Sequence, residues 1–165
     1  MILESLAKKH RAASGRSFLP TVQRNARVPY SAQQMFDLVN DIEKYPEFLH
    51  WCGDARVDAR QGSVVEATLD IRVLGLRRSF RTRNTLRSPE GIQIELVSGP
   101  FRRLRGEWRF SDLTSGGSEV SLSLAFEVTQ SPFGALFSRI FEEIAGAQMQ
   151  AFTARAQALY GGREA

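Results

Sequence analysis

The chain has 165 residues, of which 42% are hydrophobic and 24% are charged, and its formal net charge is +4. This balance excludes an intrinsically disordered chain, and the length suits one domain that buries roughly 70% of the surface exposed by its unfolded form. No apolar run approaches the roughly 18 residues that span a bilayer, and the N-terminus lacks the apolar stretch of a secretory signal. We therefore expect a protein that is neither exported nor inserted in a membrane.

Residues 1–16, MILESLAKKHRAASGR, combine a small apolar cluster with basic and small residues and show no strand pattern. We expect a flexible basic extension here, followed by a single folded domain over residues 17–162. A basic segment of this kind also fits a targeting signal or transient contact with a membrane surface.

A capped helix is predicted after a first short strand at residues 21–28. Ser31 and Gln34 have the spacing of a capping box, and apolar residues then recur at helical spacing as far as Ile42. Pro46 disfavours helical geometry at the residue before it, so residues 45–51 should form a break with a second short turn of helix.

The middle of the chain changes from a helical period to a period of two. Alternation of apolar and polar residues predicts strands at residues 64–74, 76–87, 92–96, 104–110 and 119–128. Glycine and proline turns separate them at short spacing, which favours an antiparallel meander with one dry face and one wet face.

A long helix is predicted after Pro132, with one broad apolar face. Gln148 and Arg155 fall on that same face, where they either pair with neighbours or face a cavity. The chain is thus expected to be an α+β protein, in which a curved antiparallel sheet wraps around a long C-terminal helix and two short helices follow the first strand. A pocket should remain between the sheet and the helix.

Charge is distributed unevenly along the chain. Residues 37–70 hold eight acidic side chains against three basic ones, and residues 72–109 hold ten arginines against three glutamates. Cross-strand ion pairing and a polyanion-binding surface both explain this pattern. The candidate residues for such a surface are Arg77, Arg81, Arg83, Arg87, Arg102, Arg103 and Arg105.

Residues suited to catalysis are scarce. His50 and Cys52 lie two positions apart beside Trp51, an arrangement that rarely brings a thiol and an imidazole together in an extended loop. No nucleophile-elbow, phosphate-loop or paired-cysteine motif occurs. We expect a binding protein rather than an enzyme, with no catalytic residues, no metal site and no cofactor.

Four stretches carry a resemblance to a known family: VPYSAQQMFDLVNDIEKYPEFLHWC, RSFRTRN, SGPFRRLRGEWRF and MQAFTARA. They are similar to the coenzyme Q-binding protein family, which includes the bacterial ribosome association toxins and lies within the START-like, polyketide cyclase/dehydrase superfamily. The resemblance covers about residues 20–160. His50 stands where the family often has proline, and residues 1–16 lie outside the match.

The resemblance implies a helix-grip fold with a hydrophobic tunnel for ubiquinone or a related isoprenoid lipid, in support of respiratory quinone function. The candidate ligand-binding residues are Tyr45, Phe48, Leu49, Trp51, Phe80, Trp108, Phe110 and Phe141, and for the last two plain core packing is favoured. The alternative is a ribosome association toxin that binds the large ribosomal subunit through the basic surface and blocks subunit joining. The expected location is the bacterial cytoplasm, or else the matrix side of the mitochondrion.

Overall fold

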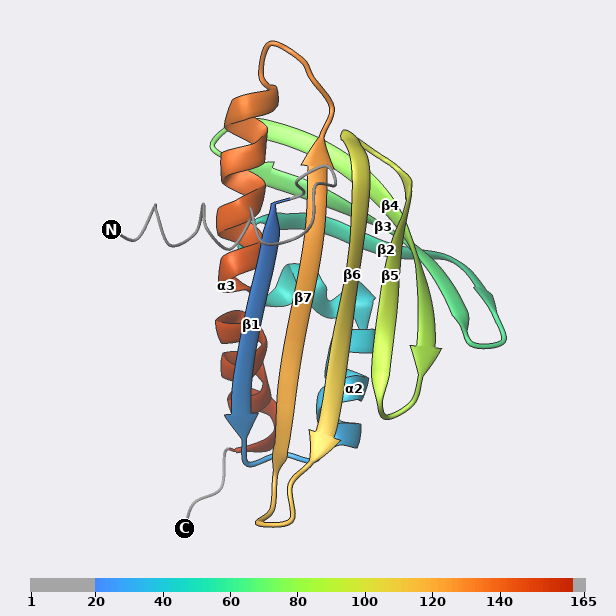
Figure 1. Cartoon of the computed structure of the whole chain (residues 1–165), viewed down its shortest axis with the longest axis vertical. Helices are drawn as coiled ribbons and strands as arrows, with labels where there is room; N and C mark the ends of the chain where they lie inside the picture. Colours follow the sequence, from blue (N-terminus) through green and yellow to red (C-terminus); the bar gives the residue numbers. More distant parts are fainter. Residues whose placement is uncertain (1–19, 162–165) are drawn as a thin grey trace, which may run out of the picture.

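Seven antiparallel strands form one curved sheet around a long C-terminal helix in the computed structural model, which describes residues 20–161 (Figure 1). The strands are β1 (Thr21–Val28), β2 (Cys52–Gln61), β3 (Val64–Val73), β4 (Leu76–Arg87), β5 (Gly91–Ser98), β6 (Phe101–Asp112) and β7 (Ser118–Val128). The helices are α2 (Ala32–Asn40), the 3₁₀ helix η1 (Ile42–Glu47) and α3 (Gly134–Tyr160). The predicted fold class is confirmed, and the predicted extension at residues 1–16 lies outside the described residues.

Strands β3 to β7 form the predicted meander, in which each strand pairs with the next along the chain, and β2 extends it by pairing with β3. The first strand, β1, pairs instead with β7 at the far edge, so the sheet order is β1-β7-β6-β5-β4-β3-β2. Helices α2 and η1 therefore carry the chain from one edge of the sheet to the other and cover part of its concave face (Figure 1).

The capping box of α2 forms as predicted. The Gln34 amide donates to Ser31 Oγ at 3.0 Å, and the Ser31 amide donates to Gln34 Oε1 at 2.9 Å. The helix ends at Asn40, because Asp41 leaves helical geometry with φ −84° and ψ 65°. Ile42 instead begins η1, whose tighter turns accommodate Pro46.

Strand β2 was not predicted. Among the described strands it lies at the sheet edge and pairs only with β3, and its register is shifted between Cys52 and Asp54 and again between Val57 and Ala59. Each irregularity interrupts the alternation of side chains, so the sequence CGDARVDARQ shows no period of two.

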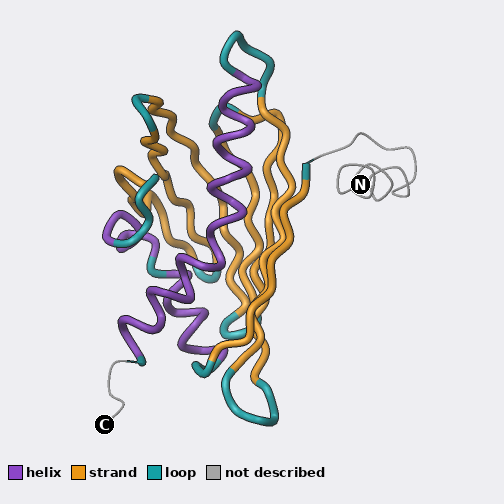
Figure 2. The backbone as a smooth tube through the Cα atoms, turned by 90° about the vertical axis from the view of Figure 1, so that its left-hand side faces the viewer, coloured by secondary structure: helices purple, strands orange, loops and turns teal. Residues whose placement is uncertain are grey.

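Helix α3 changes direction partway along its length (Figure 2). Near its midpoint, Arg24 Nε of β1 donates to the Gly146 carbonyl oxygen at 3.2 Å. A side chain that bonds to a helix carbonyl is a known source of bending. The two halves of α3 thus meet different parts of the concave face. No helix within residues 20–161 has the length and apolar character needed to cross a membrane.

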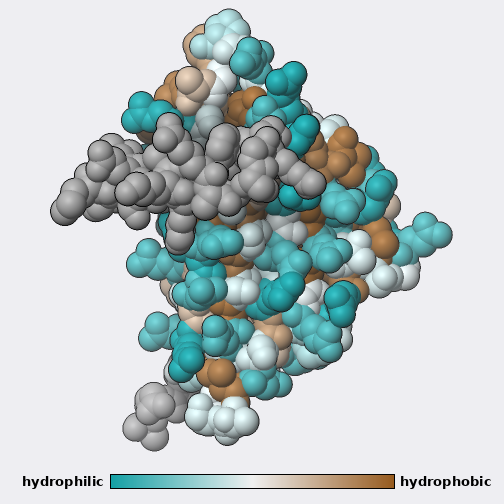
Figure 3. All heavy atoms as spheres, in the orientation of Figure 1, coloured by the Kyte–Doolittle hydropathy of each residue, from teal (hydrophilic) through white to brown (hydrophobic). Residues whose placement is uncertain are grey.

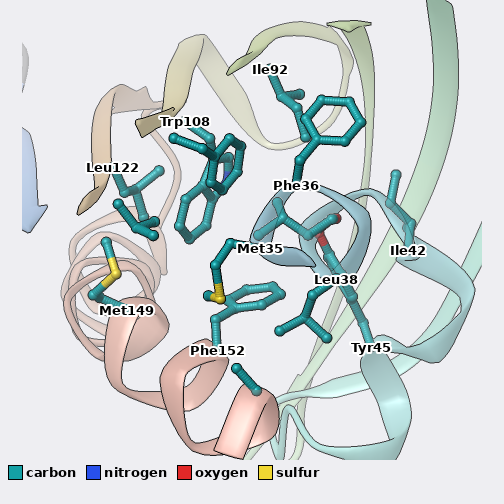
Figure 4. Close-up of a cluster of buried hydrophobic side chains, with 14 of the residues drawn as sticks. Met35, Phe36, Leu38, Ile42, Tyr45, Ile92, Trp108, Leu122, Met149 and Phe152 are labelled. Atoms are coloured by element: carbon teal, nitrogen blue, oxygen red, sulfur yellow. The ribbon is translucent and has the colours of Figure 1, made fainter. Parts of the chain in front are cut away.

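The outer face of the sheet is mainly hydrophilic (Figure 3). The concave face packs against the helices in two buried clusters. The first joins α2 and η1 to the C-terminal half of α3, where Met35 and Leu38 point toward Phe152 (Figure 4). The second joins the N-terminal half of α3 to the other end of the sheet through Phe101, Phe126 and Phe141 among others.

Candidate functional site

A cavity of about 90 Å³ lies between the concave face of the sheet and α3, where the two buried clusters meet. Its lining combines many apolar side chains with a few polar ones. The lining residues are Ile42, Tyr45, Trp51, Ala67, Leu69, Phe80, Thr82, Asn84, Ile94, Leu104, Trp108, Leu122, Leu124, Phe141, Ile144, Ala145, Gln148 and Phe152. A concave, mostly apolar site with a few convergent polar groups is the usual form of a small-molecule site.

The structure brings five of the eight candidate ligand-binding residues to this cavity, namely Tyr45, Trp51, Phe80, Trp108 and Phe141. The other three lie apart from it. Phe48 packs edge-on against Tyr45 and Phe152, Leu49 is fully buried in the first cluster, and Phe110 packs against Phe36 and Trp108.

The aromatic segment, residues 45–51, is fastened to α3 by side-chain contacts. Trp51 Nε1 donates to Gln148 Oε1 at 3.0 Å, and Arg155 Nη2 donates to Glu47 Oε1 at 3.0 Å. The Arg155 guanidinium also lies over the Phe48 ring, 5.1 Å from its centroid, in cation–π geometry. Both polar residues on the apolar face of α3 therefore bind this segment, and Gln148 lines the cavity as well.

Thr82 and Asn84 supply polar lining from β4, and sequence reasoning missed both. Each is buried, and Thr82 Oγ1 donates to Asn84 Oδ1 at 3.0 Å. Their side chains point toward the interior from β4, as that of Phe80 does. In the sequence, two polar residues at positions where the alternation of this strand calls for apolar ones could have identified them. Their amide and hydroxyl groups, with Gln148, could orient a ligand that carries an oxygen at one end.

The only cysteine, Cys52, is poorly suited to nucleophilic chemistry. Burial raises the pKa of its thiol to about 12, and Sγ donates to the Asp54 carbonyl oxygen at 3.3 Å. The thiolate is the reactive form, and its population is very small at neutral pH with such a pKa. Within residues 20–161, no group of three or more metal-ligating His, Cys, Asp or Glu side chains comes together.

Burial also raises the pKa of the Tyr45 hydroxyl. That hydroxyl donates to the carbonyl oxygen of Val39 near the end of α2. The ring is thereby held at the edge of the cavity.

The acidic and basic blocks of the sequence meet on the outer face of β3 and β4. Glu66 of β3 accepts from Arg81 Nη2 at 2.7 Å and from Arg83 Nη2 at 3.0 Å. Hydrogen bonds from Arg83 and Arg81 hold the pKa of Glu66 below its ordinary value. Much of the positive charge of these two arginines is therefore offset within the sheet.

Two of the remaining arginines of the predicted polyanion surface form longer ion pairs with carboxylates. Arg87 lies 3.6 Å from Glu90, and Arg102 lies 3.8 Å from Glu127, both in exposed positions. Arg77 and Arg105 make no ion pair with a carboxylate of residues 20–161, whereas Arg103 has an interaction of its own. Strand β5 separates β4 from β6. The candidate arginines of β4 and those of β6 therefore do not lie on neighbouring strands.

Comparison with known proteins places the chain in a family. Residues 28–153 match the family described as polyketide cyclase / dehydrase and lipid transport. The ribosome association toxin RatA of Escherichia coli (strain K12) is 39% identical over 145 residues, which cover 88% of this chain and 92% of the relative. The mitochondrial coenzyme Q-binding protein COQ10 homolog B of Xenopus laevis is 25% identical, over 82% of this chain and 57% of that protein.

Solved structures show the same fold. A START superfamily protein from Mycobacterium smegmatis superposes with a TM-score of 0.69 at 21% identity, covering 84% of this chain and 98% of its own. This superposition confirms the START-like helix-grip fold predicted from the sequence. The chain therefore belongs to the polyketide cyclase/dehydrase and lipid transport family, with RatA-type proteins among its relatives.

Proposed function

We propose that this chain acts on ribosome association by binding the large ribosomal subunit. The observation that carries the proposal is the 39% identity to proteins named ribosome association toxin RatA, which extends over 88% of the chain. This relationship is nearer than that to the coenzyme Q-binding protein, at 25% identity. A ribosomal target places the activity in the bacterial cytoplasm, and the action is one of binding rather than catalysis.

The outer face of β6 is the surface that best suits ribosomal RNA. Arg102, Arg103 and Arg105 lie there in exposed positions, and arginine forms strong bidentate contacts with phosphate. The Arg102–Glu127 pair is long and exposed, so exchanging it for a phosphate contact costs little. Arg81 and Arg83 would have to give up their bonds to Glu66 to do the same.

Sedimentation of the purified chain with ribosomal subunits tests this proposal. We expect comigration with the large subunit that weakens steeply as salt is raised, because phosphate contacts release counterions. The variant Arg102→Gln/Arg105→Gln should bind more weakly and show a shallower salt dependence. Arg81→Gln/Arg83→Gln removes the same charge from β4 and serves as the matched control. Absence of salt-sensitive comigration would refute the proposal, and a larger loss in the control would move the contact to β4.

A second candidate function is binding of ubiquinone or a related isoprenoid lipid, and the cavity is the observation that favours it. At about 90 Å³ the cavity is smaller than the roughly 150 Å³ of an engineered cavity that holds benzene. An isoprenoid would therefore require the aromatic segment and α3 to move apart. The contacts of Trp51 and Arg155 are the ones that such a movement would break.

Organic extraction of protein purified from a quinone-producing host tests the second candidate. Mass spectrometry should find a quinone or another isoprenoid lipid in near-stoichiometric amount with the native chain. An extract free of such molecules would count against lipid binding and would leave the ribosomal proposal untouched.

A further inference from the structure

Three of the large apolar side chains exposed within residues 20–161 lie at one end of the described structure. Leu74 in the β3–β4 turn is 98% exposed, and Phe133 and Leu136 at the start of α3 are 62% and 52% exposed. The β3–β4 turn and the start of α3 lie at the same end in both ribbon views (Figures 1 and 2). We call these three residues the apolar tip.

The tip stands over the second buried cluster. Val73 and Leu76 flank Leu74 and pack against that cluster, as does Ile140 of α3. Hydrophobic side chains appear among hydrophilic ones at this end in the space-filling view (Figure 3). The three exposed residues thus belong to the β3–β4 hairpin and to the start of α3, which both pack against the second buried cluster.

The backbone conformation at Leu74 is unfavourable for a leucine. Leu74 has φ 49° and Gly75 has φ 82°, so both turn residues are left-handed. Asparagine or glycine suits the first position of such a turn, whereas leucine is strained there. In water, therefore, this leucine has an unfavourable backbone and an unfavourable side-chain environment. Strain that persists at an exposed site is a reason to look for function.

Cationic side chains border the tip. Arg77 and Arg78 follow the β3–β4 turn, and Arg139 lies on the second turn of α3. All three are exposed, and none forms an ion pair with a carboxylate of residues 20–161. Asp70, the nearest acidic residue in the β3–β4 register, is already paired with Arg72.

We infer that the apolar tip docks on an anionic lipid bilayer, with its three apolar side chains among the acyl chains and the bordering arginines at the headgroup phosphates. Apolar side chains gain by entering hydrocarbon, whereas a nucleic acid backbone offers them no comparable partner. The arginines add attraction to anionic lipid. This inference goes beyond the proposed function and does not depend on it.

Cosedimentation of the full chain with vesicles tests the inference. We expect binding to vesicles that contain phosphatidylglycerol, and much weaker binding to phosphatidylcholine alone. Leu74→Asn and Phe133→Ser should each lower the vesicle affinity by about tenfold, given the apolar area that each side chain would bury. Arg77→Gln/Arg78→Gln should lower it about tenfold or more for anionic vesicles only.

Matched variants separate docking from misfolding. Leu159→Asn removes a leucine that is 51% exposed at the opposite end of α3, and it should leave vesicle binding unchanged. Leu74→Asn places a better-suited residue in the left-handed turn, so its melting temperature should be unchanged or higher. Absence of binding to anionic vesicles would overturn the inference, as would an equal loss with Leu159→Asn. Tip variants that keep vesicle binding but lose comigration with the large subunit would reassign the tip to the ribosome.

Discussion

Filling the cavity should stabilise the protein. Ala67 of β3 is buried and its side chain lines the cavity, so Ala67→Val places two more carbons in the cavity. Burying two more carbons there contributes about 1.5 kcal/mol, at about 0.8 kcal/mol each. Valine also has a high β-strand propensity, so the backbone should oppose little of this gain.

Thermal and urea unfolding measure the effect. We expect the melting temperature of Ala67→Val to rise by about 3 to 6 °C, the range for a gain of this size in a chain of this length. Ala55→Val makes the same change at a buried position of β2 that does not line the cavity, and overpacking there should cost about 1 to 3 kcal/mol. Equal destabilisation by both variants would show that the cavity cannot accept the added carbons. That result would refute the predicted stabilisation.

Trp51, Glu66 and Cys52 each allow a further test. Trp51→Phe keeps a ring but removes the donor to Gln148, so it should cost about 1 kcal/mol and speed hydrogen exchange in residues 45–51; unchanged exchange would contradict this. Arg83 lowers the pKa of Glu66, so this carboxylate stabilises the fold above its unfolded pKa and the contribution is lost as pH falls through the lower folded pKa. Glu66→Gln should therefore flatten the loss of stability in acid, and an acid slope equal to that of the native chain would refute the assignment. Because burial raises the pKa of Cys52 to about 12, a thiol reagent at pH 8 should label it only in proportion to the unfolded fraction; rapid labelling in native buffer would contradict this.

Local patterns in the sequence predicted most of the fold because they are set by neighbouring residues. The capping box at Ser31 depends on a residue three positions away, and each central strand shows its own alternation. Strand β2 was missed because it is an edge strand with two register shifts, and its pairing with β3 is what makes it a strand. The sequence also continues the apolar spacing of α2 to Ile42, although the helix type changes there.

The candidate site was harder to predict because it depends on which segments meet. The contact between Trp51 and Gln148 joins residues 97 positions apart, and no local pattern contains it. The register of β3 and β4 places Glu66 opposite Arg83, which decided between ion pairing and an open basic surface at these positions. The sequence shows how many acidic and basic residues there are, but only the strand register shows which arginines are paired with carboxylates.

The two candidate functions use opposite faces of the same strand. Leu104 of β6 lines the cavity, and the next residue, Arg105, is exposed on the outer face, because successive side chains of a strand point to opposite sides. A ligand in the cavity and a ribosomal subunit on β6 therefore need not compete for the same atoms. Effects of Ala67→Val on lipid content and of Arg105→Gln on sedimentation should then be independent in the double variant. A coupling between them would instead mean that a change in the volume of the cavity alters the curvature of β6, so that the contents of the interior affect the outer surface.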